Sequence, residues 1–382
     1  MGLAPNRAGR TQGRTMALHG YATDRDDETT PHGADQDAML RRLADLALLP
    51  ASLVSPQERS VLDTMLASLA MRFEPAMRKR IAERLAPQAD APRELAMALA
   101  LDDIDIAMPL LGEGQTLKAG DLVHVAREGS PAHRMALAAR KDLTSDIADA
   151  LIEEGDAGLI CRLLENRTSE LSLRAVETLA GRSASEPELL APLLTRPELT
   201  LRLAHRMFWW APSPLRLEIL TRFTAERRHI HNVLDEILNG GFVPDPALAS
   251  ALSVVRRPAP ADKARLHTLL ANASADGIGA LAEGLARAAR LRTETMFRIL
   301  NDAGGEPLSV FAKAAGLNRK EFGDLIVAAV DLRKGGLPGK GDLERMGELF
   351  DTISTDRADL ALHCWDVGLA NETLQAGIAD EA

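Results

Sequence analysis

Cysteine is almost absent from this sequence. Only Cys161 and Cys364 occur among 382 residues, so no disulfide framework can be built and both read as thiols of a reducing compartment. Aromatic residues are equally scarce at 3%, whereas alanine, leucine and arginine are abundant. Because β-sheet cores draw on aromatic and β-branched side chains, this composition argues against a sheet and predicts an all-α protein.

Long apolar runs are also missing. No stretch approaches the roughly 18 consecutive apolar residues of a membrane helix, and the N-terminus lacks the apolar core of a secretion signal. Acidic residues outnumber basic ones by 55 to 45, which gives a net charge of −10. An acidic surface repels nucleic acid on average. We therefore expect a cytoplasmic protein with no membrane anchor, whose partner is another protein rather than nucleic acid.

The sequence lacks the usual motifs for chemistry. Its nine histidines do not cluster with cysteines or carboxylates at metal-ligand spacing. The glycine-rich stretch 334–341 superficially resembles a phosphate loop, yet Gly341 follows Lys340 where a serine or threonine should bind magnesium, and no predicted strand precedes it. We expect no enzyme activity, no cofactor and no metal.

What the sequence does contain is a phrase that returns four times. Each copy begins with a hydroxyl residue that can cap a helix, followed by small or apolar residues at +3, +4 and +7, which is the spacing of one helix face. The copies start at Thr116, Thr144, Ser172 and Thr200, so 144 − 116 = 172 − 144 = 200 − 172 = 28 residues. A unit of this length holds two short helices that bury their apolar faces only when units stack. The repeat predicts an α-α superhelix of the HEAT or leucine-rich-variant kind.

Other local signals divide the chain. Residues 1–34 show no periodicity and are expected to form a disordered tail. Residues 35–239 are predicted to be an N-terminal helical-repeat domain, in which Ser55-Pro56-Gln57-Glu58 has the pattern of a capping box. Residues 245–382 are predicted to be a C-terminal helical subdomain, reached through a joint rich in glycine and proline.

These motifs also carry a family resemblance. Residues 143–222, with Leu164-Glu165-Asn166 among them, and residues 311–317 resemble a bacterial family catalogued as a conserved domain of unknown function. They are also similar to leucine-rich-variant and HEAT repeats. The resemblance implies a helical-repeat body over most of the chain after the tail, and it implies no catalytic residue.

Arginine recurs at the turns between units, at Arg140, Arg167 and Arg196. One interpretation is a ladder along one edge that binds carboxylates or phosphates of a partner with forked hydrogen bonds. The alternative is that each arginine caps the carbonyl end of the preceding helix, where a cation contributes about 0.3–1 kcal/mol. The alternative explains the recurrence without a ligand.

Two of the three tryptophans are adjacent, at Trp209 and Trp210. On a helix they point about 100° apart, so both can hardly face the same core. An exposed tryptophan would anchor a protein partner. The alternative is that the second one packs under the following turn.

Residues 308–326 have the spacing of a helix-turn-helix, in which Asn318, Arg319 and Lys320 would begin a DNA recognition helix. Any tight corner between two helices has the same spacing, and Glu321 and Asp324 would bring negative charge to the DNA. The first functional hypothesis is thus a non-enzymatic scaffold or regulator that binds a protein. The alternative is a DNA-binding regulator.

Overall fold

The computed structural model describes Ala38, Arg42 and residues 55–112, 114–224, 261–271, 277–332 and 339–380. Every regular element in these ranges is helical, which confirms the predicted all-α class. No helix within them is long and apolar enough to span a membrane. The expected tail at 1–34 and the joint between the predicted domains, near residues 240–245, lie outside the described residues.

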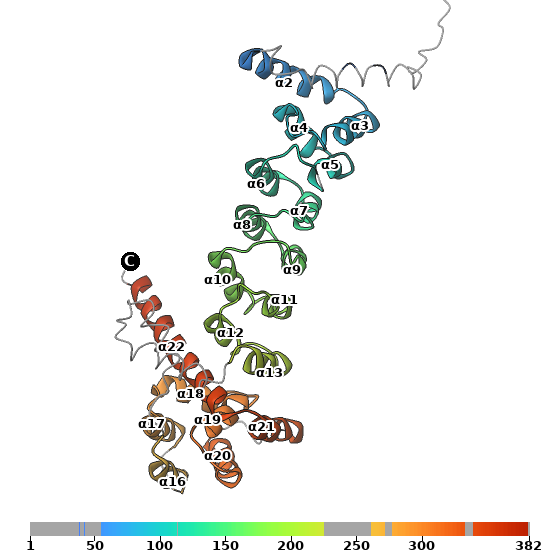
Figure 1. Cartoon of the computed structure of the whole chain (residues 1–382). Helices are drawn as coiled ribbons and strands as arrows, with labels where there is room; N and C mark the ends of the chain where they lie inside the picture. The colour runs from blue at the N-terminus through green and yellow to red at the C-terminus, as the bar shows by residue number, and fades with distance from the viewer. Residues whose placement is uncertain are drawn as a thin grey trace, which may run out of the picture.

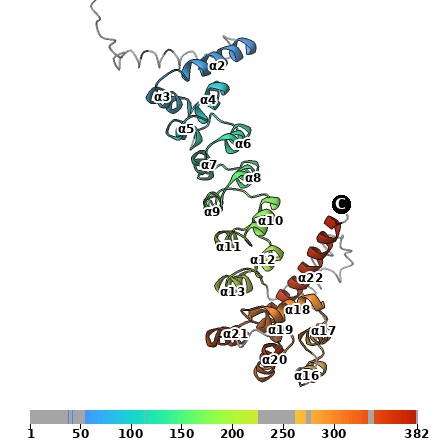
Figure 2. The same ribbon diagram turned by 180° about the vertical axis from the view of Figure 1, so that it is seen from behind.

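Helices α2 to α13 form a two-column stack (Figure 1). Successive helices alternate between columns, so that α6 packs on α8 in the even-numbered column and α5 packs on α7 in the odd-numbered one. The same two columns are seen from behind in Figure 2. The bounds are α2 (Pro56–Ala70), α3 (Pro75–Leu85), α4 (Arg93–Ala100), α5 (Ile104–Leu111), α6 (Ala119–Glu128), α7 (Pro131–Ala138), α8 (Ser145–Glu154), α9 (Ala157–Glu165), α10 (Leu173–Arg182), the 3-10 turn η1 (Pro187–Leu189), α11 (Leu190–Leu194), α12 (Leu201–Met207) and α13 (Ser213–Arg222).

Three of the four repeated phrases begin helices as predicted. Thr144, Ser172 and Thr200 are the N-cap residues of α8, α10 and α12. The Ser172 hydroxyl accepts a hydrogen bond from a backbone N–H at 3.0 Å, and the Thr200 hydroxyl accepts one at 3.4 Å. The apolar residues at +3, +4 and +7 are all buried, and they are Ile147, Ala148, Leu151, Ala175, Val176, Leu179, Leu203, Ala204 and Met207.

The first phrase is out of register with the structure. Helix α6 has Lys118, not Thr116, as its N-cap, and Asp121, Leu122 and Val125 occupy its buried positions. The reason is that the Thr116 hydroxyl has another role, since it donates to the carbonyl of Leu85 at the end of α3 at 2.6 Å. The interval between the N-caps of α6 and α8 is therefore 144 − 118 = 26 residues rather than 28.

The predicted capping box at the start of α2 is present. Glu58 N–H donates to the Ser55 hydroxyl at 3.3 Å, and Ser55 N–H donates to the Glu58 carboxylate at 2.9 Å. The Ser55 hydroxyl also donates to the Glu58 carboxylate at 2.7 Å, and this bond, together with the one from Ser55 N–H, lowers the pKa of Glu58. Helix α2 is the first described helix of the even column, and it exposes Met65 and, just past its end, Met71.

A second group of helices follows the stack (Figure 1). Its last helix, α22, leads from this group back toward the level of α10, and it packs on α12 and α13 of the stack as well as on α18 and α19. The bounds are α16 (Lys263–Ala271), α17 (Gly277–Ala289), α18 (Thr293–Asn301), α19 (Glu306–Ala314), α20 (Arg319–Leu332), α21 (Lys340–Thr352) and α22 (Thr355–Asp380).

A buried ion cluster joins this group to the stack. Arg216 on α13 donates to both carboxylate oxygens of Asp302 at 2.9 Å and to the Glu306 carboxylate at 3.0 Å. Glu306 is 1% exposed and also accepts a hydrogen bond from the Ser213 hydroxyl. The expected N-terminal and C-terminal parts of the chain are thus connected by desolvated charge as well as by apolar packing.

His205 lies at the same junction. It is 1% exposed, its Nε2 lies 3.0 Å from the carbonyl oxygen of Phe223, and its ring meets that of Trp365 edge-on at 6.3 Å. Its Nδ1 has no hydrogen-bond partner among the described residues. Burial lowers the pKa of His205 to about 4, against the smaller raising effect of the bond to Phe223.

The low pKa of His205 predicts acid sensitivity. Between pH of about 6.5 and about 4 the unfolded chain binds a proton that the folded chain does not, so this stabilisation is complete above 6.5 and is lost as the pH falls. The loss should approach about 3 kcal/mol. Urea unfolding followed by circular dichroism across this range should show a smaller loss for His205→Gln than for the natural chain. The exposed His124→Gln serves as the control, and equal slopes for all three proteins would contradict the assignment.

Candidate functional site

A groove of about 880 Å³ opens along the odd-numbered column. Ile104 and Met108 of α5 form one wall, Met135 of α7 forms the other, and Leu117 from the loop after α5 lies between them. Arg162 of α9 closes one end. Three successive helices of one column therefore contribute to a single site.

The groove is hollow because α7 presents alanines to it. Ala132, Ala136 and Ala139 are spaced by four and three residues, so they share one helix face, and they leave the space that larger side chains would fill. Met108 and Met135 stand over this space with 47% and 42% of their surface exposed. Exposed methionines beside an apolar floor are suited to binding apolar side chains, because the thioether adapts its shape to its contacts.

Arg140 holds the floor of the groove. It is 4% exposed, and its guanidinium donates to the carbonyls of Leu111 at 2.8 Å and Gly114 at 3.2 Å. Two further bonds of 2.8 Å join it to the Asp142 carboxylate and lower the pKa of Asp142. Arg140 thereby fixes the end of α5 and the loop that follows, so its role at the groove is to position other groups.

The charge left on the rim is positive. Arg140 neutralises Asp142, which leaves Lys141 and Arg162 as the other charged residues that line the groove, and both are exposed. Arg162 lies 3.6 Å from Glu165 in an exposed pair of the same helix, a contact of little energy. The rim thus differs from the chain as a whole, whose net charge is −10.

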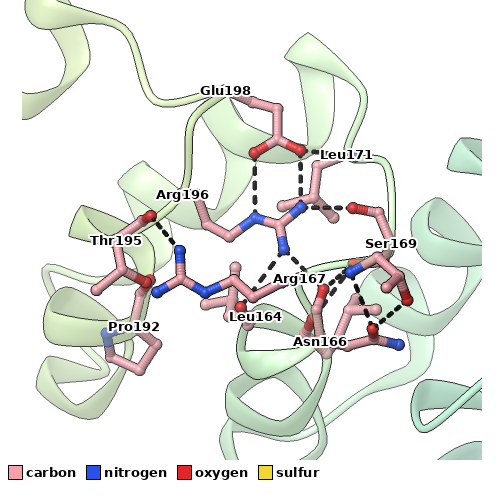
Figure 3. Close-up of polar contacts among 11 residues, drawn as sticks. Leu164, Asn166, Arg167, Ser169, Leu171, Pro192, Thr195, Arg196 and Glu198 are labelled. Carbon is pink, nitrogen blue, oxygen red and sulfur yellow. Dashed lines mark hydrogen bonds and ion pairs between the residues drawn. The ribbon is translucent and has the colours of Figure 1, made fainter. Parts of the chain in front are cut away.

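Arg196 makes the same contacts two units further along (Figure 3). It is 2% exposed and donates to the carbonyls of Asn166 at 2.8 Å and Ser169 at 2.6 Å, at the end of α9. Its other bonds, of 3.1 and 2.7 Å, go to the two oxygens of Glu198. Partial burial acts to raise the pKa of Glu198, but the bonds from Arg196 lower it overall.

In the unit between those of Arg140 and Arg196, an asparagine caps the neighbouring helix end. Asn166 Nδ2 donates to the carbonyls of Ala138 at 2.9 Å and Arg140 at 2.6 Å, at the end of α7. Arg167 donates forward to the carbonyl of Thr195 at 2.9 Å, past the end of α11 (Figure 3). The three predicted arginines therefore all cap helix ends, which is the alternative considered from the sequence. The capped helix is not the preceding one but a neighbour in the same column.

This capping corrects the ladder interpretation for the two buried arginines. The donors of Arg140 and Arg196 point into the chain and are hydrogen-bonded there, so they do not present forked hydrogen bonds to a partner. Arg167 is exposed, with one guanidinium nitrogen bonded to Thr195.

One protein-family model covers most of this chain. The family model of an uncharacterised protein conserved in bacteria (DUF2336) matches residues 106–363. The chain belongs to this family. The match begins within α5 and ends within α22, so it includes the ion cluster of the junction and every groove-lining residue except Ile104. No curated protein and no solved structure matches the chain.

The tryptophans lie at the junction rather than on an open surface. Trp209 is half-buried, with its ring 5.2 Å from that of Trp365 and the Arg298 guanidinium 4.3 Å above it. Trp210 is also half-buried and donates from Nε1 to the Ser183 hydroxyl at 3.0 Å. Adjacent tryptophans are accommodated because one faces α22 and the other faces the end of α10.

The segment 308–326 forms the predicted pair of helices, α19 and α20. Gly316 makes the turn with φ of 71°, a left-handed conformation that favours glycine. Asn318 caps α20 by accepting the N–H groups of Lys320 at 2.9 Å and Glu321 at 3.0 Å. Arg319 pairs with Asp351 of α21, and Lys320 is exposed. Asn318 and Arg319 thus make the contacts expected of a tight αα-corner.

The described residues contain no group of three or more histidine, cysteine, aspartate or glutamate side chains that could hold a metal ion. Neither cysteine forms a disulfide. Burial and nearby glutamates raise the pKa of Cys161, which disfavours a reactive thiolate.

The groove was not predicted from the sequence. A signal was present, because Met108 and Met135 are 135 − 108 = 27 residues apart, close to one repeat unit. Equivalent positions in stacked units lie side by side. The periodicity alone did not reveal that these two side chains are exposed.

The capping role of Arg196 is tested by Arg196→Lys. An ammonium group cannot reach the Glu198 carboxylate and the two carbonyls together, so buried carbonyls lose their donors. Urea unfolding should show a loss of about 2–4 kcal/mol. The exposed Arg162→Lys should change stability by less than about 0.5 kcal/mol. Equal stability of the two variants would show that the forked contacts are dispensable.

Proposed function

We propose that this protein is a non-enzymatic scaffold or regulator that binds a protein partner through the α5–α7 groove. The observation that carries the proposal is the pair of exposed methionines, Met108 and Met135, over an apolar floor that buried Arg140 holds in place. An apolar groove edged by methionines, whose unbranched side chains adapt to their contacts, suits a protein segment.

The lining of the groove supports binding rather than turnover. Among the described lining residues the one carboxylate is that of Asp142, which is held in a two-bond ion pair with Arg140 and so is not poised as a general base. The rest of the described lining is apolar except for Gln115 and the cations Arg140, Lys141 and Arg162. Acid–base chemistry would need a suitable partner for Asp142, and the described lining residues supply no second carboxylate, histidine or cysteine.

The repeat architecture supports the same proposal. We assign the stack to the HEAT or leucine-rich-variant type of α-repeat, whose elongated columns offer broad surfaces to other proteins. A cytoplasmic site of action belongs to the proposal, because neither cysteine forms a disulfide and disulfides are rare in reducing compartments.

DNA binding by α19 and α20 is less well supported. The helix-turn-helix spacing is realised, but Arg319 is paired with Asp351, and Asn318 is used as the helix cap. Phosphate contacts require available cations, and the recognition helix would bring Glu321 and Asp324 with it.

The proposal predicts that a polar groove loses its partner. Met108→Gln with Met135→Gln should lower the amount of the main co-purifying protein about tenfold, because two apolar anchors are removed without disturbing the core. Quantitative mass spectrometry after affinity capture measures this. The matched control is Met65→Gln with Met71→Gln, two methionines of similar exposure at α2.

Each outcome of that comparison is informative. Loss of the partner in the control but not in the groove variant would move the binding surface to α2. If neither pair of substitutions alters any co-purifying protein, the groove is not a docking site.

A further inference from the structure

We infer that the α5–α7 groove takes an acidic amphipathic helix, with apolar residues between Met108 and Met135 and carboxylates against Lys141 and Arg162. This inference rests on the proposed function and names the chemistry of the partner. It draws on the shape of the groove and on the sign of the charge at its rim.

The shape of the groove fits a helix. It is lined by a row of alanines, Ala132 and Ala136 of α7 and Ala139 at the C-cap of that helix, which have the spacing of one helix face. Helices pack closely when the ridges of one meet small residues of the other. An added helix would lie across three members of the column and insert residues spaced by three or four positions, as in other helix-in-groove complexes. The volume of about 880 Å³ accommodates several such side chains.

The rim selects for negative charge. Lys141 and Arg162 are both exposed, and the nearby carboxylate of Asp142 is already bound by Arg140. Among the described residues, Glu165 also pairs with the rim, and its contact with Arg162 at 3.6 Å is one that a partner carboxylate can replace.

The charge of the whole molecule strengthens the preference of the groove for an acidic segment. The net charge of −10 repels an acidic segment from most of the surface and favours the groove, where the sign is reversed. A basic segment would instead be attracted to many other sites on the chain. The cationic rim therefore makes an acidic segment prefer the groove to the rest of the surface.

Designed peptides test the chemistry directly on the full-length chain. Three fluorescein-labelled helical peptides share the same leucines: one carries glutamates beside them, one carries lysines instead, and one has the glutamate sequence scrambled so that the leucines no longer share a face. Fluorescence anisotropy should show that the glutamate peptide binds at least about tenfold more tightly than either other peptide, with affinity that falls as salt is added.

Variants locate the binding. Lys141→Glu with Arg162→Glu should weaken the glutamate peptide about tenfold and strengthen the lysine peptide. Arg174→Glu with Lys320→Glu makes the same change in net charge at exposed positions away from the groove, and should leave both affinities within about twofold. Equal binding of all three peptides, tighter binding of the lysine peptide, or an equal response of the two charge variants would overturn the inference.

The test separates this inference from the proposed function. A co-purifying protein that depends on Met108 and Met135 but tolerates Lys141→Glu with Arg162→Glu leaves the groove as the docking site and removes the acidic helix. A co-purifying protein that depends on neither pair removes the groove itself. Oligomerisation that Met108→Gln abolishes would identify a second copy of this chain as the occupant and would also reject the acidic helix.

Discussion

Short helices leave a large share of their backbone carbonyls without a partner inside the helix. The last four carbonyls of any α-helix lack an intrahelical donor, and most helices of this stack have only eight to ten residues. In this chain, side chains of other helices and turns donate to several of these carbonyls. Between units, the pairs are Thr116 with the end of α3, His133 with the turn after α4, Arg140 with α5, Asn166 with α7, Arg182 with α8 and Arg196 with α9. Within one unit, Arg134 of α7 donates to the end of α6.

This arrangement explains why the site lies where it does. The Arg140 side chain is buried and donates hydrogen bonds to the carbonyl at the end of α5 and to that of Gly114 in the following loop. It also forms an ion pair with the Asp142 carboxylate. The groove floor becomes rigid, and the cations that remain on the rim, Lys141 and Arg162, belong to residues with no capping bond in the described structure. Adjacent residues of one turn thus have separate roles, since Arg140 is structural while Lys141 faces the solvent.

Most of the repeat could be predicted from the sequence, whereas the groove could not, and the difference has a physical cause. Hydroxyl caps and buried faces are local, so the phrases at Thr144, Ser172 and Thr200 could be read directly. Thr116 failed because its hydroxyl is used by α3, about thirty residues earlier in the chain. The recurring arginines were visible, but whether their donors face inward or outward depends on which carbonyls the stacking brings near them. The groove depends on that same stacking, because its walls come from separate helices.

The most direct test of the capping account is amide hydrogen exchange on Arg140→Gln, read out by mass spectrometry. The account predicts that protection falls in the last turn of α5 and in the loop at Gly114, one unit before the substituted residue, while α12 and α13 keep theirs. A loss confined to the residues around 140, or no loss at all, would contradict the claim that side chains of one unit stabilise the helix ends of another.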